Sequence, residues 1–171
     1  MRIISGEFGG LRINIPKNLP IRPTTDMAKE GVFNTLNNLI NLESTNVLDL
    51  FSGSGIIGFE AASRGAKNVT FVEINKKYLN HIILNAKKFE YDQFNFMARD
   101  AHRFIKKSKN YDIIFADPPY GLYEMNIFIE NALKKLNKGG ILILESSSKE
   151  TLEGFDKIAK FGDTNLLYWK V

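Results

Sequence analysis

The spacing of hydrophobic residues changes at residue 46 and divides the chain into two parts. Beyond it, short apolar runs typical of buried strands alternate with stretches whose apolar residues recur every three to four positions, as on one helix face. The runs predict strands over residues 47–50, 69–72, 94–97, 111–116 and 141–144. The spacing predicts helices over residues 56–64, 78–86, 101–107 and 128–136, the last ended by Gly139 and Gly140. Such alternation indicates right-handed crossovers and a mostly parallel sheet covered on both faces.

The two ends of the chain follow other patterns. Residues 1–23 are rich in glycine and proline and predict a short hairpin, with arms at residues 3–4 and 11–15, followed by a polar connector. Next comes a helix capped by Thr24 or Thr25. Residues 156–161 and 165–170 predict a second hairpin, which adds an antiparallel element at one edge of the sheet.

We therefore expect an α/β domain over residues 24–171, preceded by a hairpin and connector over residues 1–23. Gly31, inside the first expected helix, costs about 1 kcal/mol relative to alanine, so this helix should depend on tertiary contacts.

Composition narrows the class of protein. A chain of 171 residues that is 44% hydrophobic fits one domain with a sizeable core. The absence of cysteine excludes disulfides, thiolate metal sites and cysteine nucleophiles. No apolar run reaches the roughly 18 residues of a membrane helix, and Glu7 comes too early for a signal peptide, so we expect a soluble, cytoplasmic protein.

The formal charge of +4 leaves two interpretations of the lysine clusters open. They are either solvated helix ends, where cations are favoured, or a phosphate-binding face. The chain has two histidines, His81 and His102. Neither stands in a motif with a nucleophile or in a cluster of metal ligands, so we predict no metal site.

The first chemical motif is a glycine-rich turn between a predicted strand and a predicted helix. Gly53 to Gly58 match G-x-G-x-x-G, and Glu73 follows Gly53 by twenty residues, where a ribose-binding acid is expected. The motif is compatible with a dinucleotide and with S-adenosylmethionine.

Charge separates these two cofactors. Acidic residues stand at or just beyond the first four strand ends: Asp49, Glu73, Asp100 and Asp117. A pyrophosphate close to Asp49 would cost on the order of kcal/mol, whereas the sulfonium and ammonium of S-adenosylmethionine are attracted. We therefore predict S-adenosylmethionine, with Asp49 at its ammonium, Glu73 at its ribose hydroxyls and Asp100 at its adenine amine. The predicted cofactor site comprises Asp49, Phe51, Ser52, Gly53, Ser54, Gly55, Glu73 and Asp100.

The second motif is Asp117-Pro118-Pro119-Tyr120, directly after the fourth predicted strand. An exocyclic base amine is a poor nucleophile because its lone pair is delocalised into the ring. Asp117 and the Pro118 carbonyl can accept hydrogen bonds from the amine and orient its lone pair toward the methyl group. Tyr120 offers a face on which the base stacks. The motif predicts methylation of an amino nitrogen, with Asp117, Pro118 and Tyr120 as catalytic residues.

These motifs and several further segments resemble the bacterial RsmD family, which methylates the N2 amine of one guanine in small-subunit (16S) ribosomal RNA. The matching segments are residues 1–6, Arg22-Pro23-Thr24-Thr25-Asp26, residues 30–34, residues 48–55, residues 61–66, Val72-Glu73 and Asp117-Pro118-Pro119-Tyr120. The resemblance implies a class I, Rossmann-like, seven-stranded sheet and an N-terminal extension that contacts RNA through Arg12, Arg22, Thr24 and Thr25. It also implies 16S rRNA as partner, within the 30S subunit or an assembly intermediate; a monomer is the default.

The chain departs from the family pattern in two places. The family usually has basic residues roughly where Glu7, Gly9 and Leu11 stand here, and an Arg or Lys where this chain has Met27. Both differences reduce the positive charge expected to face RNA, and neither touches the chemistry.

Three other functions remain. A DNA adenine-N6 or cytosine-N4 methyltransferase shares the second motif, but base flipping usually requires a target-recognition segment for which the spacing leaves no room. A nicotinamide-dependent oxidoreductase would use the glycine turn alone. A non-catalytic RNA-binding module would not need Asp117, Pro118 and Tyr120 together.

Overall fold

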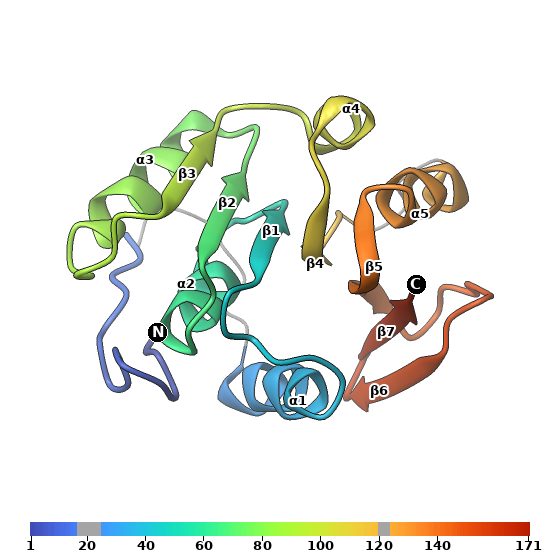
Figure 1. The fold of residues 1–171 in the computed structure, drawn as a ribbon, viewed down its shortest axis with the longest axis horizontal. Coiled ribbons are helices and arrows are strands. Elements are labelled where there is room, and N and C mark those ends of the chain that lie inside the picture. The colour runs from blue at the N-terminus through green and yellow to red at the C-terminus, as the bar shows by residue number, and fades with distance from the viewer. Residues whose placement is uncertain (17–24, 120–123) are drawn as a thin grey trace.

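The described residues of the computed structural model, 1–16, 25–119 and 124–171, form a seven-stranded mixed sheet with helices on both faces (Figure 1). The sheet order is β3-β2-β1-β4-β5-β7-β6. The strands are β1 (Asn46–Leu50), β2 (Asn68–Val72), β3 (Phe94–Met97), β4 (Tyr111–Ala116), β5 (Leu136–Ser147), β6 (Lys157–Phe161) and β7 (Thr164–Lys170). The helices are α1 (Asp26–Asn37), α2 (Ile56–Ser63), α3 (Lys76–Ala86), α4 (Ala101–Lys107) and α5 (Met125–Leu133).

This topology confirms the predicted fold class. Strands β1 to β5 pair in parallel, and β6 and β7 form the antiparallel hairpin at one edge. Helices α4 and α5 cover one face, and α1, α2 and α3 cover the other (Figure 1). The chain proceeds from β1 outward to β3, then crosses back to β4, so the order reverses between β1 and β4. Ligands of doubly wound sheets bind at such a switch point, beyond the carboxyl ends of the strands.

The region between α5 and β5 differs from the prediction. Leu136 was expected on the last helix and Gly139-Gly140 at its end, but α5 ends at Leu133 and β5 begins at Leu136. The register with β4 shifts within this stretch, since Leu136 pairs with Tyr111 and Ile141 with Ile113. Gly139, at φ 79°, provides the left-handed backbone inside the irregularity. The two glycines therefore lie in an irregular part of β5 and do not end a helix.

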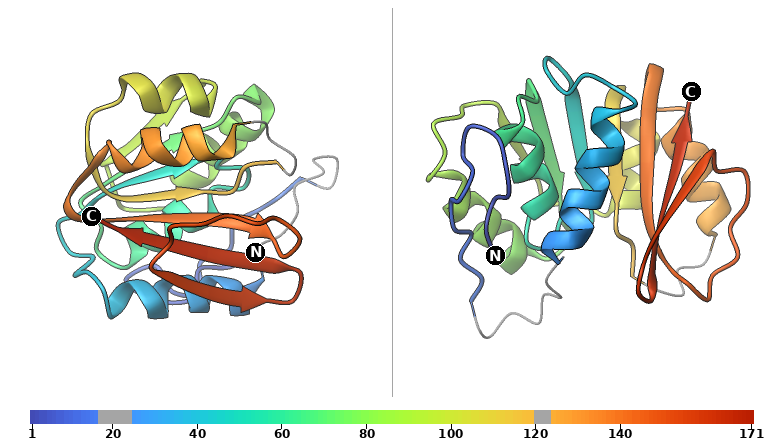
Figure 2. Two further views of the ribbon diagram at one scale, coloured as in Figure 1. Left: turned by 90° about the vertical axis from the view of Figure 1, so that its right-hand side faces the viewer. Right: turned by 90° about the horizontal axis from the view of Figure 1, so that it is seen from below.

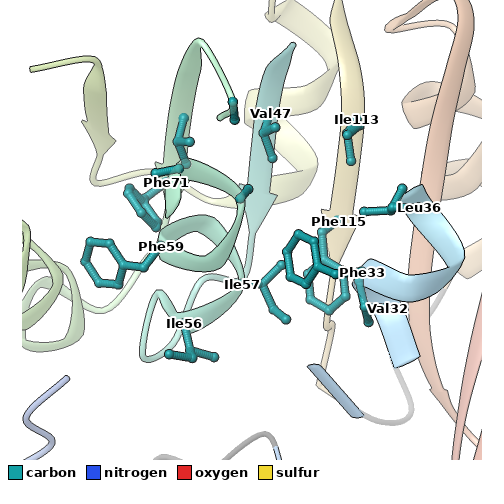
Figure 3. Packing of buried hydrophobic residues seen from close by; sticks show 14 of the residues in the cluster. Val32, Phe33, Leu36, Val47, Ile56, Ile57, Phe59, Phe71, Ile113 and Phe115 are labelled. Atoms are coloured by element: carbon teal, nitrogen blue, oxygen red, sulfur yellow. The ribbon is translucent and has the colours of Figure 1, made fainter. Parts of the chain in front are cut away.

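Helix α1 confirms the expected dependence on tertiary contacts. Its N-cap is Thr25, whose side chain accepts a hydrogen bond from the Ala28 amide. Val32, Phe33 and Leu36 are buried against Phe115 and Ile113 of β4 (Figure 3). A β-carbon added at Gly31 would lie 2.1 Å from Cζ of Phe161, so the glycine lets β6 approach the helix closely.

The N-terminal segment lies against the layer of α1, α2 and α3 (Figure 2). One antiparallel bridge joins Arg2 to Arg12, flanked by backbone hydrogen bonds between residues 3 and 11 and between residues 13 and 1. The predicted hairpin is therefore present in a short, irregular form. Ile3 and Ile13 are buried in the same core cluster as α1 and α2. The proposed domain boundary at residues 23 and 24 lies outside the described residues.

No helix in the described part of the chain is both long and apolar enough to cross a membrane.

Candidate active site

The turn from β1 to α2 has an unusual backbone. Phe51, Gly53 and Gly55 all have left-handed φ angles, of 57°, 51° and 75°. Glycine adopts this conformation freely, but for Phe51 it is a strained arrangement of the kind found at functional sites. A β-carbon on Gly55 would lie 3.1 Å from atoms of Ile82 and Phe59, so the side chains of α2 and α3 pack closely against the turn. The sequence indicated the glycines but not the conformation of Phe51.

Two serines of this turn have structural contacts. The Ser52 hydroxyl donates to the Asp49 carbonyl at 2.7 Å and accepts from the Val72 amide at 3.0 Å, which joins the ends of β1 and β2. The Ser54 hydroxyl accepts from the Ile56 amide at 3.3 Å. Both side chains are buried, so their contribution at this site is to fix the shape of the turn.

Asp49 lies inside the molecule, with only 2% of its surface exposed. Its Oδ2 accepts a hydrogen bond from the amide of Gly58, in the first turn of α2, at 3.1 Å. Burial raises the pKa of the Asp49 carboxyl well above its usual 3.8, and the charges of Asp117 and Glu73 add to that effect. Burial therefore disfavours the charged form of this carboxyl, whereas a neighbouring cation would favour it.

Glu73 connects the two loops that follow β1 and β2. Its Oε2 accepts from the Gly53 amide at 3.0 Å and its Oε1 from the Asn75 amide at 2.8 Å. The side chain is buried and fixed from both sides. Because a carboxylate oxygen can accept more than one hydrogen bond, these contacts leave capacity for two hydroxyl groups.

Asp100 is the N-cap of α4. Its Oδ1 accepts from the Arg103 amide at 2.9 Å. The sequence predicts that Asp100 accepts a hydrogen bond from the adenine amine. The capping bond to Arg103 uses one oxygen of this carboxylate, Oδ1. Asp100 is partly exposed and lines pockets on both sides of α4.

Asp117 and Pro118 follow β4, next to β1 and therefore at the switch point of the sheet. Asp117 is exposed and Pro118 buried. Asp49 lies in β1, Glu73 directly follows β2 and Asp117 directly follows β4. Because β1 pairs in parallel with both β2 and β4, these three acids lie at the same edge of the sheet. Tyr120, the last residue of the predicted catalytic loop, lies outside the described residues.

The predicted RNA-contacting residues are only partly described. Arg12 is exposed, and its carbonyl accepts from Nζ of Lys88 at 2.9 Å. Thr25 caps α1. Arg22 and Thr24 lie outside the described residues. Arg12 belongs to the segment on the face of α1, α2 and α3, away from α4 and α5.

The residues that hold this N-terminal segment in place were not predicted from the sequence. The Ser63 hydroxyl accepts from the Phe8 amide at 3.0 Å and donates to the Ser5 carbonyl at 2.6 Å. Asn85 pairs with both backbone groups of Asn14 at 3.0 Å. Their partners are backbone groups more than fifty residues away, which no spacing in the sequence can reveal.

A cluster of aromatic rings that includes Phe51 of the turn was also not predicted from the sequence. The His102 ring lies 4.9 Å from the ring of Phe128 and 6.0 Å from that of Phe51. The cluster borders a pocket of about 320 Å³ between α4 and α5. The described residues hold no group of three or more His, Asp or Glu side chains suited to a metal ion.

The similarity of this chain to known proteins extends over nearly its whole length. Residues 1–170 match the protein family described as Conserved hypothetical protein 95. The chain is 36% identical over 155 residues to the ribosomal RNA small subunit methyltransferase D of Buchnera aphidicola subsp. Acyrthosiphon pisum (strain APS), covering 88% of this chain and 80% of that protein.

Solved structures agree with this similarity. The putative methyltransferase yhhF from Escherichia coli is 26% identical, with a TM-score of 0.86 over 99% of this chain and 97% of that one. The putative methylase HI0767 from Haemophilus influenzae is 28% identical, with a TM-score of 0.75 over 99% and 97%. These similarities confirm the predicted methyltransferase fold.

Proposed function

This chain belongs to the RsmD family, described as Conserved hypothetical protein 95, and we propose that it methylates the N2 amine of a guanine in 16S ribosomal RNA. S-adenosylmethionine is the methyl donor. The matched family and the name of the Buchnera relative support the general activity, which is methylation of small-subunit rRNA. The choice of a guanine amine rests on the loop that begins at Asp117 and on the resemblance of the motifs.

The observation that carries the proposal is that Asp49, Glu73 and Asp117 lie at the carboxyl ends of three neighbouring parallel strands, at the switch point of the sheet. In our proposal Asp49 faces the ammonium group of the cofactor and Glu73 accepts from its ribose hydroxyls. Three acids in a partly buried site favour a cationic ligand and disfavour an anionic one.

The hydrogen bonds of the turn argue against a dinucleotide. A pyrophosphate would need free amides at the turn and at the start of α2. In this chain the Gly53 amide donates to Glu73 and the Gly58 amide donates to Asp49. The protein's own carboxylates occupy the positions that a phosphate would take, which supports S-adenosylmethionine.

Transfer itself requires an oriented amine. Asp117 and the carbonyl of Pro118 accept from the two N–H groups of the guanine amine, while Tyr120 stacks on the base. Positioning of nitrogen, methyl and sulfur in line supplies most of the rate enhancement. We propose that the substrate is the 30S subunit or an assembly intermediate, and that the protein acts as a monomer.

The experiment is incubation of unmodified 30S subunits with the protein and methyl-labelled S-adenosylmethionine, followed by digestion of the rRNA to nucleosides. We expect label in N2-methylguanosine of 16S rRNA. Naked 16S rRNA and duplex DNA run in parallel separate the possible substrates. Label in N6-methyladenine or N4-methylcytosine of the DNA would contradict the proposed substrate.

A further inference from the structure

Two buried polar side chains lie next to each other on β5 and β7. Ser146 on β5 is 1% exposed and Asn165 on β7 is 8% exposed, and the two residues are cross-strand partners. Neither Oγ of Ser146 nor Oδ1 of Asn165 has a hydrogen-bond partner among the described residues. A buried polar atom without a partner lowers stability, so such atoms are rare in native proteins and need an explanation. We call these two residues the Ser146–Asn165 pair.

The pair lies at the carboxyl edge of the sheet. Strand β5 is parallel to β4, and the last residue of β4, Ala116, pairs with Leu144, two residues before Ser146. Side chains two residues apart on a strand share a face, so Ser146 lies on the same face as Leu144, and Asn165 on the same face as Leu167. Leu144 and Leu167 belong to the core beneath α4 and α5. Both members of the pair therefore lie on that face, just beyond the end of β4.

This part of the edge lies on the far side of β4 from the candidate cofactor site. The acids proposed to bind the cofactor, Asp49, Glu73 and Asp100, lie in or after β1, β2 and β3. In the sheet order, β4 separates these three strands from β5 and β7 (Figure 1). Asp117, which we propose orients the amine, directly follows β4. The Ser146–Asn165 pair therefore lies on the side of Asp117 that the cofactor leaves to the substrate.

The chemistry of the pair matches one base. A side-chain amide oxygen can only accept a hydrogen bond, whereas a hydroxyl can also donate. Beside its N2 amine, guanine carries a donor, the ring N1–H, followed by an acceptor, O6. Adenine and cytosine instead carry a ring-nitrogen acceptor beside the amine. An amide oxygen that lacks a donor therefore complements guanine and opposes the other two bases.

We propose that the Ser146–Asn165 pair binds the N1–H and O6 groups of the target guanine and thereby selects guanine over adenine and cytosine. N1–H donates to Oδ1 of Asn165, and the Ser146 hydroxyl donates to O6. The two hydrogens of the N2 amine remain for Asp117 and the Pro118 carbonyl. The inference deepens the proposed function and rests on it, since it concerns the same guanine.

The first test compares Ser146→Ala and Asn165→Leu with the control Tyr168→Phe. The control removes a buried hydroxyl from the opposite face of β7, where Tyr168 belongs to the core beneath α1 and α2. For both test variants we expect kcat/KM for 30S subunits to fall at least about tenfold, with an unchanged affinity for S-adenosylmethionine. Their free energy of unfolding should stay the same or rise, because no hydrogen bond within the protein is lost. The control should keep the kcat/KM of the wild type.

The second test changes the base. The methylated guanine is replaced by 2,6-diaminopurine in 30S subunits reconstituted from ligated 16S rRNA. This base keeps the N2 amine but carries an acceptor at N1 and an amine in place of O6. We expect the replacement to lower kcat/KM of the wild type at least about tenfold, and to lower that of Ser146→Ala and Asn165→Leu much less, because the lost contacts are the same. A purely structural pair would give the same decrease in all three proteins.

The outcomes separate this inference from the proposed function. If the wild type methylates a guanine N2 in 30S subunits and both test variants keep its kcat/KM, the inference is overturned and the function stands. Loss of stability together with activity, and an equal effect of diaminopurine on the wild type and the variants, would assign the pair a structural role and also overturn the inference. If the wild type transfers no methyl to 30S subunits, or labels adenine or cytosine in DNA, both are overturned.

Discussion

Among single residues, we expect the charge of Asp49 to depend most on the cofactor, because we propose that its carboxyl faces the cofactor's ammonium group. Burial raises its pKa, while the Gly58 amide favours the ionised form. A bound ammonium group would favour ionisation further. Cofactor binding and loss of the Asp49 proton should therefore be linked.

This linkage predicts that binding of S-adenosylmethionine releases a proton at pH values below the raised pKa of Asp49 in the free protein and above the lower pKa of Asp49 beside the bound ammonium group. Across that window the affinity should rise with pH. Calorimetric titration in buffers of different ionisation enthalpy measures the released proton. Asp49→Asn, which keeps an acceptor for the Gly58 amide, should abolish the release. The same release from Asp49→Asn would show that another group is responsible.

The same raised pKa predicts that the stability of the cofactor-free protein changes with pH in the direction opposite to the cofactor affinity. A raised pKa means that the Asp49 carboxyl contributes stability below pH 3.8 and loses that contribution as the pH rises through the raised value. At neutral pH, Asp49→Asn should therefore increase the free energy of unfolding of the cofactor-free protein while weakening cofactor binding. Urea denaturation measures the first effect; a decrease in stability would contradict the assignment.

At the scale of elements, the contact between α1 and β6 depends on Gly31. Alanine is favoured over glycine in a helix by about 1 kcal/mol, yet its β-carbon would meet the Phe161 ring. Overpacking typically costs about 1–3 kcal/mol, so Gly31→Ala should lower the free energy of unfolding. Glu30→Ala, at an exposed neighbouring position, is the control and should not destabilise. Stabilisation by Gly31→Ala would show that β6 can move away freely.

The N-terminal segment offers a second prediction at this scale. Deleting the segment would remove Ile3 and Ile13 from the core, so a point variant is the better probe. Ser63→Ala removes the bonds to Ser5 and Phe8, which should cost about 1–3 kcal/mol of stability and weaken binding to 30S subunits. Affinity for S-adenosylmethionine should stay the same. Ser148→Ala, at an exposed position, is the control. An unchanged affinity for 30S subunits would remove the segment from the RNA-binding surface.

The elements themselves were largely predictable because each strand and helix has its own hydrophobic period. The predictions for β3, α4 and β4 agree with the structure to the residue. The start of β5 was not predictable, since Leu136 continues the helical spacing and only its pairing with Tyr111 places it in the sheet. The burial of Ile3 and Ile13 depends in the same way on contacts with distant parts of the chain.

At the scale of the whole molecule, acidic groups lie along the carboxyl edge of the sheet, and exposed cations lie along the adjoining side of α4. The acids were predictable as a set because the carboxyl ends of parallel strands meet at one edge. Their individual contacts were not: Asp100 caps α4, and Glu73 holds two loops together. The cluster of cations beside α4 was not predictable from the lysine clusters alone, because only the structure places Arg99 and Arg103 beside Lys106 and Lys107.

We propose that Asp49 and Glu73 hold the cofactor and that Asp117 orients the amine. The most direct measurement is methyl transfer from labelled S-adenosylmethionine to unmodified 30S subunits by the wild type, Asp117→Ala and Asp49→Ala, with cofactor affinity measured for each. We predict that Asp117→Ala binds the cofactor normally and transfers methyl at least about a hundredfold more slowly. Asp49→Ala should lose cofactor affinity first. Normal transfer by Asp117→Ala would contradict the account.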